Sequence, residues 1–143
     1  MRLKELFLFW FGGSFYVTLE VFYRGYSHIS MFILAGVVFS LVGLLNEVFP
    51  WEFDLVWQDV IGTGVALIGE YFTGMLVNVK LGLNVWDYSN EFLNLNGQIC
   101  LKFGLIWIPL ILLAIVIDDI IRWRFYGEER PRYYLFGKMI KIK

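Results

Sequence analysis

Residues 56–79 read VWQDVIGTGVALIGEYFTGMLVNV, and this stretch decides the fold class of the chain. It is longer than the ~20 residues that a helix needs to cross the ~30 Å hydrocarbon core of a bilayer. It also carries Asp59 near one end and Glu70 in its interior, among small residues such as glycine and alanine. A charged side chain at membrane depth costs roughly 2.5 kcal/mol or more, so these acids must face other helices or a wet cavity. The stretch therefore predicts a membrane-spanning helix that other helices surround.

The composition of the whole 143-residue chain agrees with a membrane protein. Hydrophobic residues make up 59% of it and aromatic residues 20%, whereas soluble domains average about 45–50% apolar residues. Backbone groups in lipid must be hydrogen-bonded internally, so each apolar span has to be a helix. We expect an all-α integral membrane protein, a single domain over residues 1–143. Its compact bundle of four transmembrane helices is predicted at residues 6–23, 29–49, 56–79 and 101–123.

Lysine and arginine are distributed unevenly about these spans. Three lie on the side of the 80–100 loop, namely Arg24, Lys80 and Lys102, and the other nine of the 12 lie on the side of the termini. The positive-inside rule then places both termini in the cytoplasm, and we expect a bacterial cytoplasmic membrane. The basic tail, residues 124–143, is expected to lie along the inner headgroups as a short amphipathic piece. The net charge of −1 indicates no nucleic-acid partner.

The loop of residues 80–100 mixes aromatic side chains with asparagine and acidic residues. An interfacial lid anchored by its aromatic residues is one interpretation. A re-entrant segment packed into the bundle is the other, since irregular backbone is allowed at depth only where protein or water covers it. Both conformations remain open at this stage.

Small residues recur at helical spacing in two spans. Gly36, Ser40 and Gly43 form such a stripe in the second span, and Gly62 and Gly69 belong to one in the third. Small side chains let helix backbones approach closely. We therefore expect the second and third spans to pack together as the tight centre of the bundle.

The polar residues separate into two groups by depth and side. Glu20 and Arg24 are four residues apart, so they can pair on one helix face. With them, the outer candidates for a ligand-binding cavity are Glu20, Arg24, His28, Glu70, Asn78, Asp87 and Gln98. A cytoplasmic polar network is predicted from Glu47, Asp59, Asp118, Asp119 and Arg122. These groups could line one pathway, form two separate networks, or build one site with an anchor opposite.

The common enzyme templates are missing from the sequence. The only histidine, His28, excludes a multi-histidine metal centre, and the only cysteine, Cys100, excludes a cysteine cluster. No GxxxxGK[ST] phosphate loop is present, so ATP hydrolysis by that route would need another chain. We expect no metal site and no cofactor, and no catalytic residue can be named.

A family resemblance is carried by GGSFYVTLEVFYRGYSHISMF (12–32), LLNE (44–47), QDVIG (58–62) with GE (69–70), LGLNVWDYS (81–89), NGQICLKF (96–103) and DDIIRWRFYGEERPRY (118–133). Together these segments resemble the small bacterial membrane proteins of the CmpB-like family, which are classed as type IV ABC-transporter permeases. The resemblance covers nearly the whole chain and implies a small multi-span protein with a permease role.

Three functional hypotheses follow from these observations. The first is a transporter or permease-like membrane subunit that binds a small polar or charged solute in an intramembrane polar cavity. Such a subunit would sit in the lipid bilayer as a homodimer or in a larger complex, with a separate ATPase subunit, since complete carriers are typically built from paired repeats. The second is a membrane-embedded enzyme acting on a lipid or lipid-linked substrate at the outer interface. The third is a structural or regulatory subunit of a membrane complex.

Overall fold

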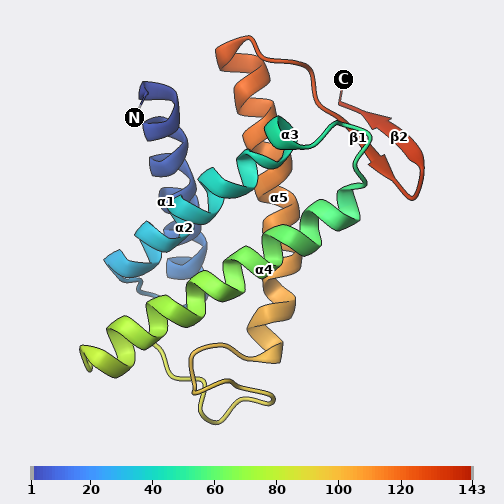
Figure 1. Cartoon of the computed structure of the whole chain (residues 1–143). Helices are drawn as coiled ribbons and strands as arrows, with labels where there is room; N and C mark the ends of the chain where they lie inside the picture. Colours follow the sequence, from blue (N-terminus) through green and yellow to red (C-terminus); the bar gives the residue numbers. More distant parts are fainter. Residues whose placement is uncertain (1, 143) are drawn as a thin grey trace.

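The computed structural model describes residues 2–142, which form mostly helices (Figure 1). Four helical segments are long and apolar enough to cross a membrane, which confirms the predicted number. In chain order they are α1 (Leu3–Arg24), α2 (Ile29–Gly43) with the short α3 (Leu45–Val48), α4 (Leu55–Gly74) with the π-helical turn η1 (Met75–Lys80), and α5 (Leu101–Tyr126).

Helices α1 and α5 run further toward the chain ends than their apolar runs predict. The ammonium of Lys4, in the first turn of α1, lies 2.5 Å from the carboxylate of Glu128, just after α5. Helix hydrogen bonding does not stop where apolar residues stop, so charged residues extend both helices beyond the apolar spans. The contact also places the start of α1 beside the end of α5. Both termini therefore lie at one end of the bundle, here called the termini end, and the 81–100 loop lies at the other, the loop end (Figure 1).

Local sequence signals set the helix boundaries. Gly25 ends α1 in the left-handed conformation, with φ of 84°, which glycine adopts without a steric penalty. The imidazole of His28 accepts a hydrogen bond from the Ser30 backbone N–H at 3.1 Å and so caps α2. Asp54 caps α4 in the same way, accepting from the Val56 N–H at 2.8 Å. These caps satisfy backbone donors that have no partner inside the helix.

Glycines bring α1 and α2 into close contact. Gly12 of α1 lies against the ring of Phe39, and Gly13 lies against Phe32. In return, Gly36 of α2 lies against Phe9 of α1. A β-carbon at any of these positions would overlap its neighbour, so the absence of a side chain permits the approach.

The small-residue stripe of α2 contacts helices other than the one expected. Gly36 packs on α1, and Gly43 packs on Asp118 of α5. Contacts with α4 come instead from Leu34, which lies against Gly69, and from Val42, which lies against Gly62. The second and third spans thus pack together as expected, and α2 also touches the other two helices. Small-residue spacing identifies positions of close approach but not the partner helix.

The loop of residues 81–100 folds back on the loop end of the bundle. Val85 and Trp86 are buried there, whereas Phe92 and Leu93 project outward with exposed side chains. Gly74, at the end of α4, lies against Gln98 and Trp86. One part of the loop therefore packs on the helices, while its tip presents apolar side chains to the surroundings.

The tail forms a β-hairpin in place of the expected amphipathic piece. Strand β1 (Arg132–Leu135) pairs antiparallel with β2 (Lys138–Lys141), with Leu135 opposite Lys138. Phe136 and Gly137 form the two-residue turn, both with positive φ, as a tight hairpin requires. Tyr133 of β1 is buried, and its ring lies 6.0 Å from that of Trp51. This aromatic contact packs the hairpin onto the turn before α4.

Candidate functional site

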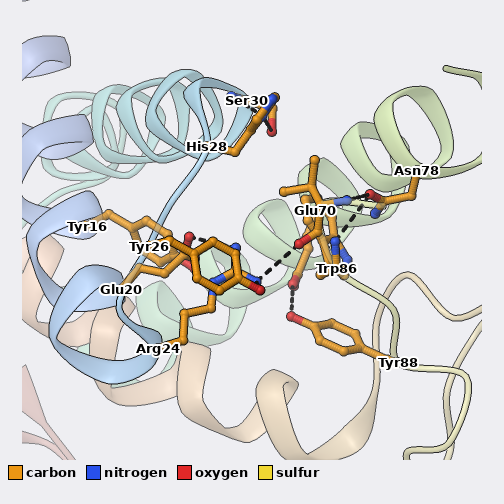
Figure 2. A network of polar contacts seen from close by, with 11 residues as sticks. Tyr16, Glu20, Arg24, Tyr26, His28, Ser30, Glu70, Asn78, Trp86 and Tyr88 are labelled. Atoms are coloured by element: carbon orange, nitrogen blue, oxygen red, sulfur yellow. Dashed lines mark hydrogen bonds and ion pairs between the residues drawn. The ribbon is translucent and has the colours of Figure 1, made fainter. Parts of the chain in front are cut away.

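A cavity of about 320 Å³ lies at the loop end, between α1, α5 and the 81–100 loop. Its charged lining residues, Glu20 and Arg24, both come from α1 (Figure 2). We call it the loop-end cavity; it is lined by Tyr16, Leu19, Glu20, Tyr23, Arg24, Met31, Trp86, Tyr88, Phe103, Ile106 and Leu110.

Glu20 and Arg24 form an ion pair on one face of α1. The guanidinium lies 3.0 Å from the Glu20 carboxylate, as their i, i+4 spacing predicts. The hydroxyl of Tyr16 donates a second hydrogen bond to this carboxylate at 2.9 Å. Arg24 also donates to the backbone carbonyl of Val85 at 3.1 Å and thereby ties α1 to the loop. The side chains of Glu20 and Arg24 are only 10% and 22% exposed, so the pair is largely shielded from bulk water.

Aromatic rings make up one wall of the loop-end cavity. Tyr23 meets Phe103 edge-on with ring centroids 6.4 Å apart, and Phe103 stacks on Tyr88 at 4.8 Å. Tyr88 in turn lies 6.5 Å from Trp86. The four rings come from α1, α5 and the loop, so only the folded chain assembles them. They form an apolar but electron-rich surface beside the ion pair.

Glu70 lies behind this wall. Its side chain is buried, and it accepts a hydrogen bond from the indole N–H of Trp107 at 2.7 Å. The hydroxyl of Tyr88 donates a second one at 3.1 Å (Figure 2). Burial and the neighbouring Glu70 carboxylate raise the pKa of the Tyr88 hydroxyl above its ordinary value, so the hydroxyl remains a donor at neutral pH. Among residues 2–142, Arg24 makes no ion pair with Glu70. The two aromatic donors satisfy the acid instead.

Asn78 and Gln98 hold the loop in place. The amide of Asn78 donates to the side-chain carbonyl of Gln98 at 2.9 Å and accepts from the Val85 backbone N–H at 2.7 Å. The Trp86 indole donates to the Gln98 backbone carbonyl at 2.9 Å. Both residues therefore hold Trp86 in the cavity wall. Neither is among the described residues that line the cavity itself.

His28 and Asp87 also lie outside the described lining of the loop-end cavity. His28 caps α2 through Ser30. The carboxylate of Asp87 accepts from both the hydroxyl and the backbone N–H of Ser89, and these hydrogen bonds hold its pKa below the ordinary range. Both side chains stabilise local backbone conformation, which is a common role for short polar residues at turns.

A second, polar cavity of about 410 Å³ lies at the termini end. Arg122 of α5 is its central cation and is only 5% exposed. Its guanidinium lies 2.7 Å from Asp118, and 3.7 Å from each of Glu47 and Glu128. We call it the termini-end cavity; it is lined by Asn46, Glu47, Trp51, Asp119, Arg122, Glu128 and Glu129.

Two buried aspartates stand behind Arg122. Asp118 is fully buried, and one of its carboxylate oxygens has no hydrogen-bond partner among residues 2–142. Asp119 accepts from the amide of Asn46 and, at 2.7 Å, from the hydroxyl of Tyr133 in the hairpin. Burial and the neighbouring Asp119 carboxylate raise the pKa of the Tyr133 hydroxyl, so the hydroxyl remains a donor. The tail thus closes one side of this polar cluster.

Asp59 was expected in the cytoplasmic polar network around Arg122, but its hydrogen bond lies elsewhere. Its carboxylate accepts from the Thr63 hydroxyl at 3.2 Å, one turn further along α4. It is not among the described residues that line the termini-end cavity. Asp59 lies near the start of α4, but the direction in which a helix presents a side chain depends on its rotation in the bundle.

Trp107 and Tyr133 are partners of buried acids that the sequence did not single out. Each carries one polar hydrogen on a large apolar ring, and such a group usually finds an acceptor when it is buried. A tryptophan within the apolar run of the fourth span was therefore a usable signal.

No group of three or more His, Cys, Asp or Glu side chains able to hold a metal ion occurs in the described part of the chain.

Four membrane-crossing helices with polar clusters at both ends define a small polytopic integral membrane protein. A family model described as "Putative ABC-transporter type IV" matches residues 7–135. The chain therefore belongs to this family, as the resemblance of its CmpB-like segments implies, and the match together with the four apolar helices supports a transporter-like membrane protein. No curated protein and no solved structure matched the chain in the corresponding comparisons.

Proposed function

We propose that the chain is a permease-like membrane subunit that binds a small polar or charged solute in the loop-end cavity. The observation that carries the proposal is the shielded Glu20–Arg24 pair, whose side chains are 10% and 22% exposed, in the wall of a cavity of about 320 Å³. Ligand pockets are typically about 300–1,000 Å³, mostly apolar, with a few polar groups that orient the ligand. The loop-end cavity has this composition.

The two ends of the bundle have different roles in this proposal. The loop-end cavity receives the solute from the outer side, and the termini end faces the cytoplasm of a bacterial cell. The uneven distribution of lysine and arginine supports this orientation. Glu70, Asn78 and Gln98 act indirectly, by holding Tyr88 and Trp86 in the cavity wall.

The proposal includes partners. Four helices are few for an alternating-access carrier, which typically combines paired repeats, so a homodimer or a larger complex supplies the rest. The sequence has no phosphate loop for ATP hydrolysis, so a separate ATPase subunit supplies the energy. The charged rim of the termini-end cavity, formed by Glu47, Glu128 and Glu129, supports a cytoplasmic contact there.

The enzyme hypothesis has less support. It draws on the acids of the same cavity together with His28 and Asp87, and these two side chains have local structural partners. A purely structural role leaves the shielded ion pair without a purpose beyond tying α1 to the loop.

Equilibrium binding to the purified chain in lipid nanodiscs tests the proposal, because binding needs no ATPase subunit. The probes are radiolabelled amino acids, glycine betaine, spermidine and inorganic phosphate, tested with wild type, Glu20→Gln and Arg24→Gln. We expect binding of at least one probe, weakened at least tenfold in both variants. Asp87→Asn is the matched control, because it neutralises a carboxylate at the same end but outside the cavity, and it should leave binding unchanged. Binding of no probe, or equal binding by wild type and Glu20→Gln, would contradict the proposal.

A further inference from the structure

A narrow apolar cavity continues the loop-end cavity toward the middle of the bundle. Its volume is about 50 Å³, and it shares Tyr16, Leu19 and Leu110 with the loop-end cavity. From there it extends along α1 to Gly12 and along α5 to Ala114 and Ile117. Of the described residues that line it, none carries a charge. We call this the apolar groove.

The apolar groove suits a hydrocarbon chain better than water. About 10–15 Å³ of such volume holds one water molecule, so a cavity of this size could hold several. A water molecule needs two to four polar partners, and apolar cavities stay dry and accept apolar ligands. The described lining is mostly apolar, and the polar hydrogens of Tyr16 and Trp107 are already donated to Glu20 and Glu70, so it offers no such set of partners. The groove is therefore a place for methylene groups.

The combined length of the two cavities exceeds that of a small solute. Arg24 lines one end and Gly12 the other, both on α1. At 1.5 Å of rise per residue, this stretch of helix covers about 18 Å. That is more than half of the ~30 Å hydrocarbon core. A ligand that fills both cavities would be elongated, with its polar part at the loop end.

The charges at the loop end indicate the kind of polar part. Glu20 and Arg24 lie 3.0 Å apart, so they present opposite charges side by side. A group that itself carries a positive and a negative charge matches both, whereas a group of single charge is repelled by one of them. The adjacent rings of Tyr23, Phe103 and Tyr88 favour a quaternary ammonium, which binds aromatic faces.

The rims of the two cavities face the surrounding lipid. Phe15 and Leu19 of α1 are each 39% exposed, and Ile106 of α5 is 40% exposed. Large apolar side chains exposed on membrane-crossing helices contact lipid tails. An amphiphile can therefore enter sideways, between α1 and α5, without leaving the bilayer.

From these observations we infer that the ligand of the loop-end cavity is a single-chain amphiphile with a zwitterionic head, such as a lysophosphatidylcholine. The head lies against Glu20, Arg24 and the aromatic wall, and part of the chain lies in the apolar groove. This inference rests on the part of the proposed function that places a ligand beside Glu20 and Arg24 in the loop-end cavity, and it identifies the polar or charged group as the head of an amphiphile.

Equilibrium binding of tritiated lauroyl-lysophosphatidylcholine tests the inference. The protein is held in lipid nanodiscs, and the probe bound by empty nanodiscs is subtracted. All ligand amounts are expressed as mole ratios of ligand to lipid. Two competitors separate head from tail: glycerophosphocholine has the head alone, and dodecyl maltoside has a chain with an uncharged head. We expect glycerophosphocholine to compete at least 100-fold more weakly than the unlabelled probe, and dodecyl maltoside at least tenfold more weakly.

Substitutions in the groove provide the second arm. Ala114→Phe should fill the groove and weaken probe binding at least tenfold. Leu113→Phe is the matched control, because the neighbouring side chain is 48% exposed and does not belong to the described lining. If Ala114→Phe fails to fold, a chain-length series on wild type decides, and equal affinity for octyl and dodecyl phosphocholine would overturn the inference.

The outcomes separate this inference from the proposed function. If glycerophosphocholine competes as well as the probe, or folded Ala114→Phe binds normally, while Glu20→Gln weakens binding, the ligand is a small solute. The inference is then overturned and the proposed function stands. If Glu20→Gln changes the binding of neither the probe nor glycerophosphocholine, both are overturned.

Discussion

Trp107 of α5 donates its indole N–H to the carboxylate of Glu70 on α4 over 2.7 Å. Tyr88 supplies the second donor from the loop, at 3.1 Å. A polar group buried in an apolar environment is costly unless it is hydrogen-bonded, and here two aromatic side chains meet that need. The acid that made the third span unusual thus joins two helices and the loop, and it supports the wall of the loop-end cavity from behind.

Removal of the indole donor should weaken the fold. In Trp107→Phe, the ring is largely retained but Glu70 loses its shortest hydrogen bond, and a buried acceptor left unpaired costs about 1–3 kcal/mol. Unfolding in mixed micelles of increasing denaturing-detergent content measures the loss. Trp57→Phe is the control, because Trp57 is 60% exposed and its replacement should change the free energy of unfolding little. Equal stability of the two variants would contradict the assigned role of Trp107.

Gly43 and Gly64 should respond oppositely to the same substitution. A β-carbon at Gly43 would overlap the carboxylate of Asp118, whereas one at Gly64 meets no atom within 4 Å in the described structure. Gly43→Ala should therefore displace Asp118 from Arg122 and destabilise the protein by about 1–3 kcal/mol. Gly64→Ala should be neutral or stabilising by up to about 1 kcal/mol, because alanine favours helix. Thermal unfolding of both variants in one detergent makes the comparison. A loss of stability in Gly64→Ala but not in Gly43→Ala would refute this prediction.

The hairpin should loosen when its buried hydroxyl is removed. Tyr133→Phe deletes the hydrogen bond of 2.7 Å to Asp119, at a cost of about 1–3 kcal/mol because the buried acceptor loses a donor. Amide hydrogen exchange of residues 132–141 should become faster, while exchange in α2 stays slow. Tyr134→Phe controls for the loss of a hydroxyl from the same strand. Unchanged protection in Tyr133→Phe would show that aromatic packing alone holds the hairpin.

The orientation of the bundle can be tested with single cysteines. Phe92 at the loop tip is 74% exposed and Phe136 in the hairpin turn is 81% exposed. In a Cys100→Ala background, Phe92→Cys should react with a membrane-impermeant maleimide on intact cells. Phe136→Cys should react only after the cells are permeabilised. If Phe136→Cys instead reacted on intact cells and Phe92→Cys only after permeabilisation, the topology that the positive charges predict would be wrong.

The four spans could be predicted because the property that defines them is local. Each apolar run is long enough by itself to cross a bilayer, whatever the other runs do. The Glu20–Arg24 pair was predictable for a related reason, since four residues along a helix bring two side chains together without help from the rest of the chain. Depth also separated the polar residues into groups at the two ends of the bundle.

The tertiary structure decided what those residues face. Asp59 accepts from Thr63 on its own helix rather than joining the cluster around Arg122. The fold of the loop gave Glu70 the donor Tyr88, and the packing of α5 gave it the donor Trp107, which are 18 and 37 residues away in the chain. It also formed the hairpin that brings Tyr133 to Asp119. A sequence pattern encodes which side chains share one helix face, but the contacts between different helices, loops and strands depend on how all of them pack. Membrane insertion therefore followed from the sequence alone, whereas the two cavities and the groove exist only in the assembled bundle.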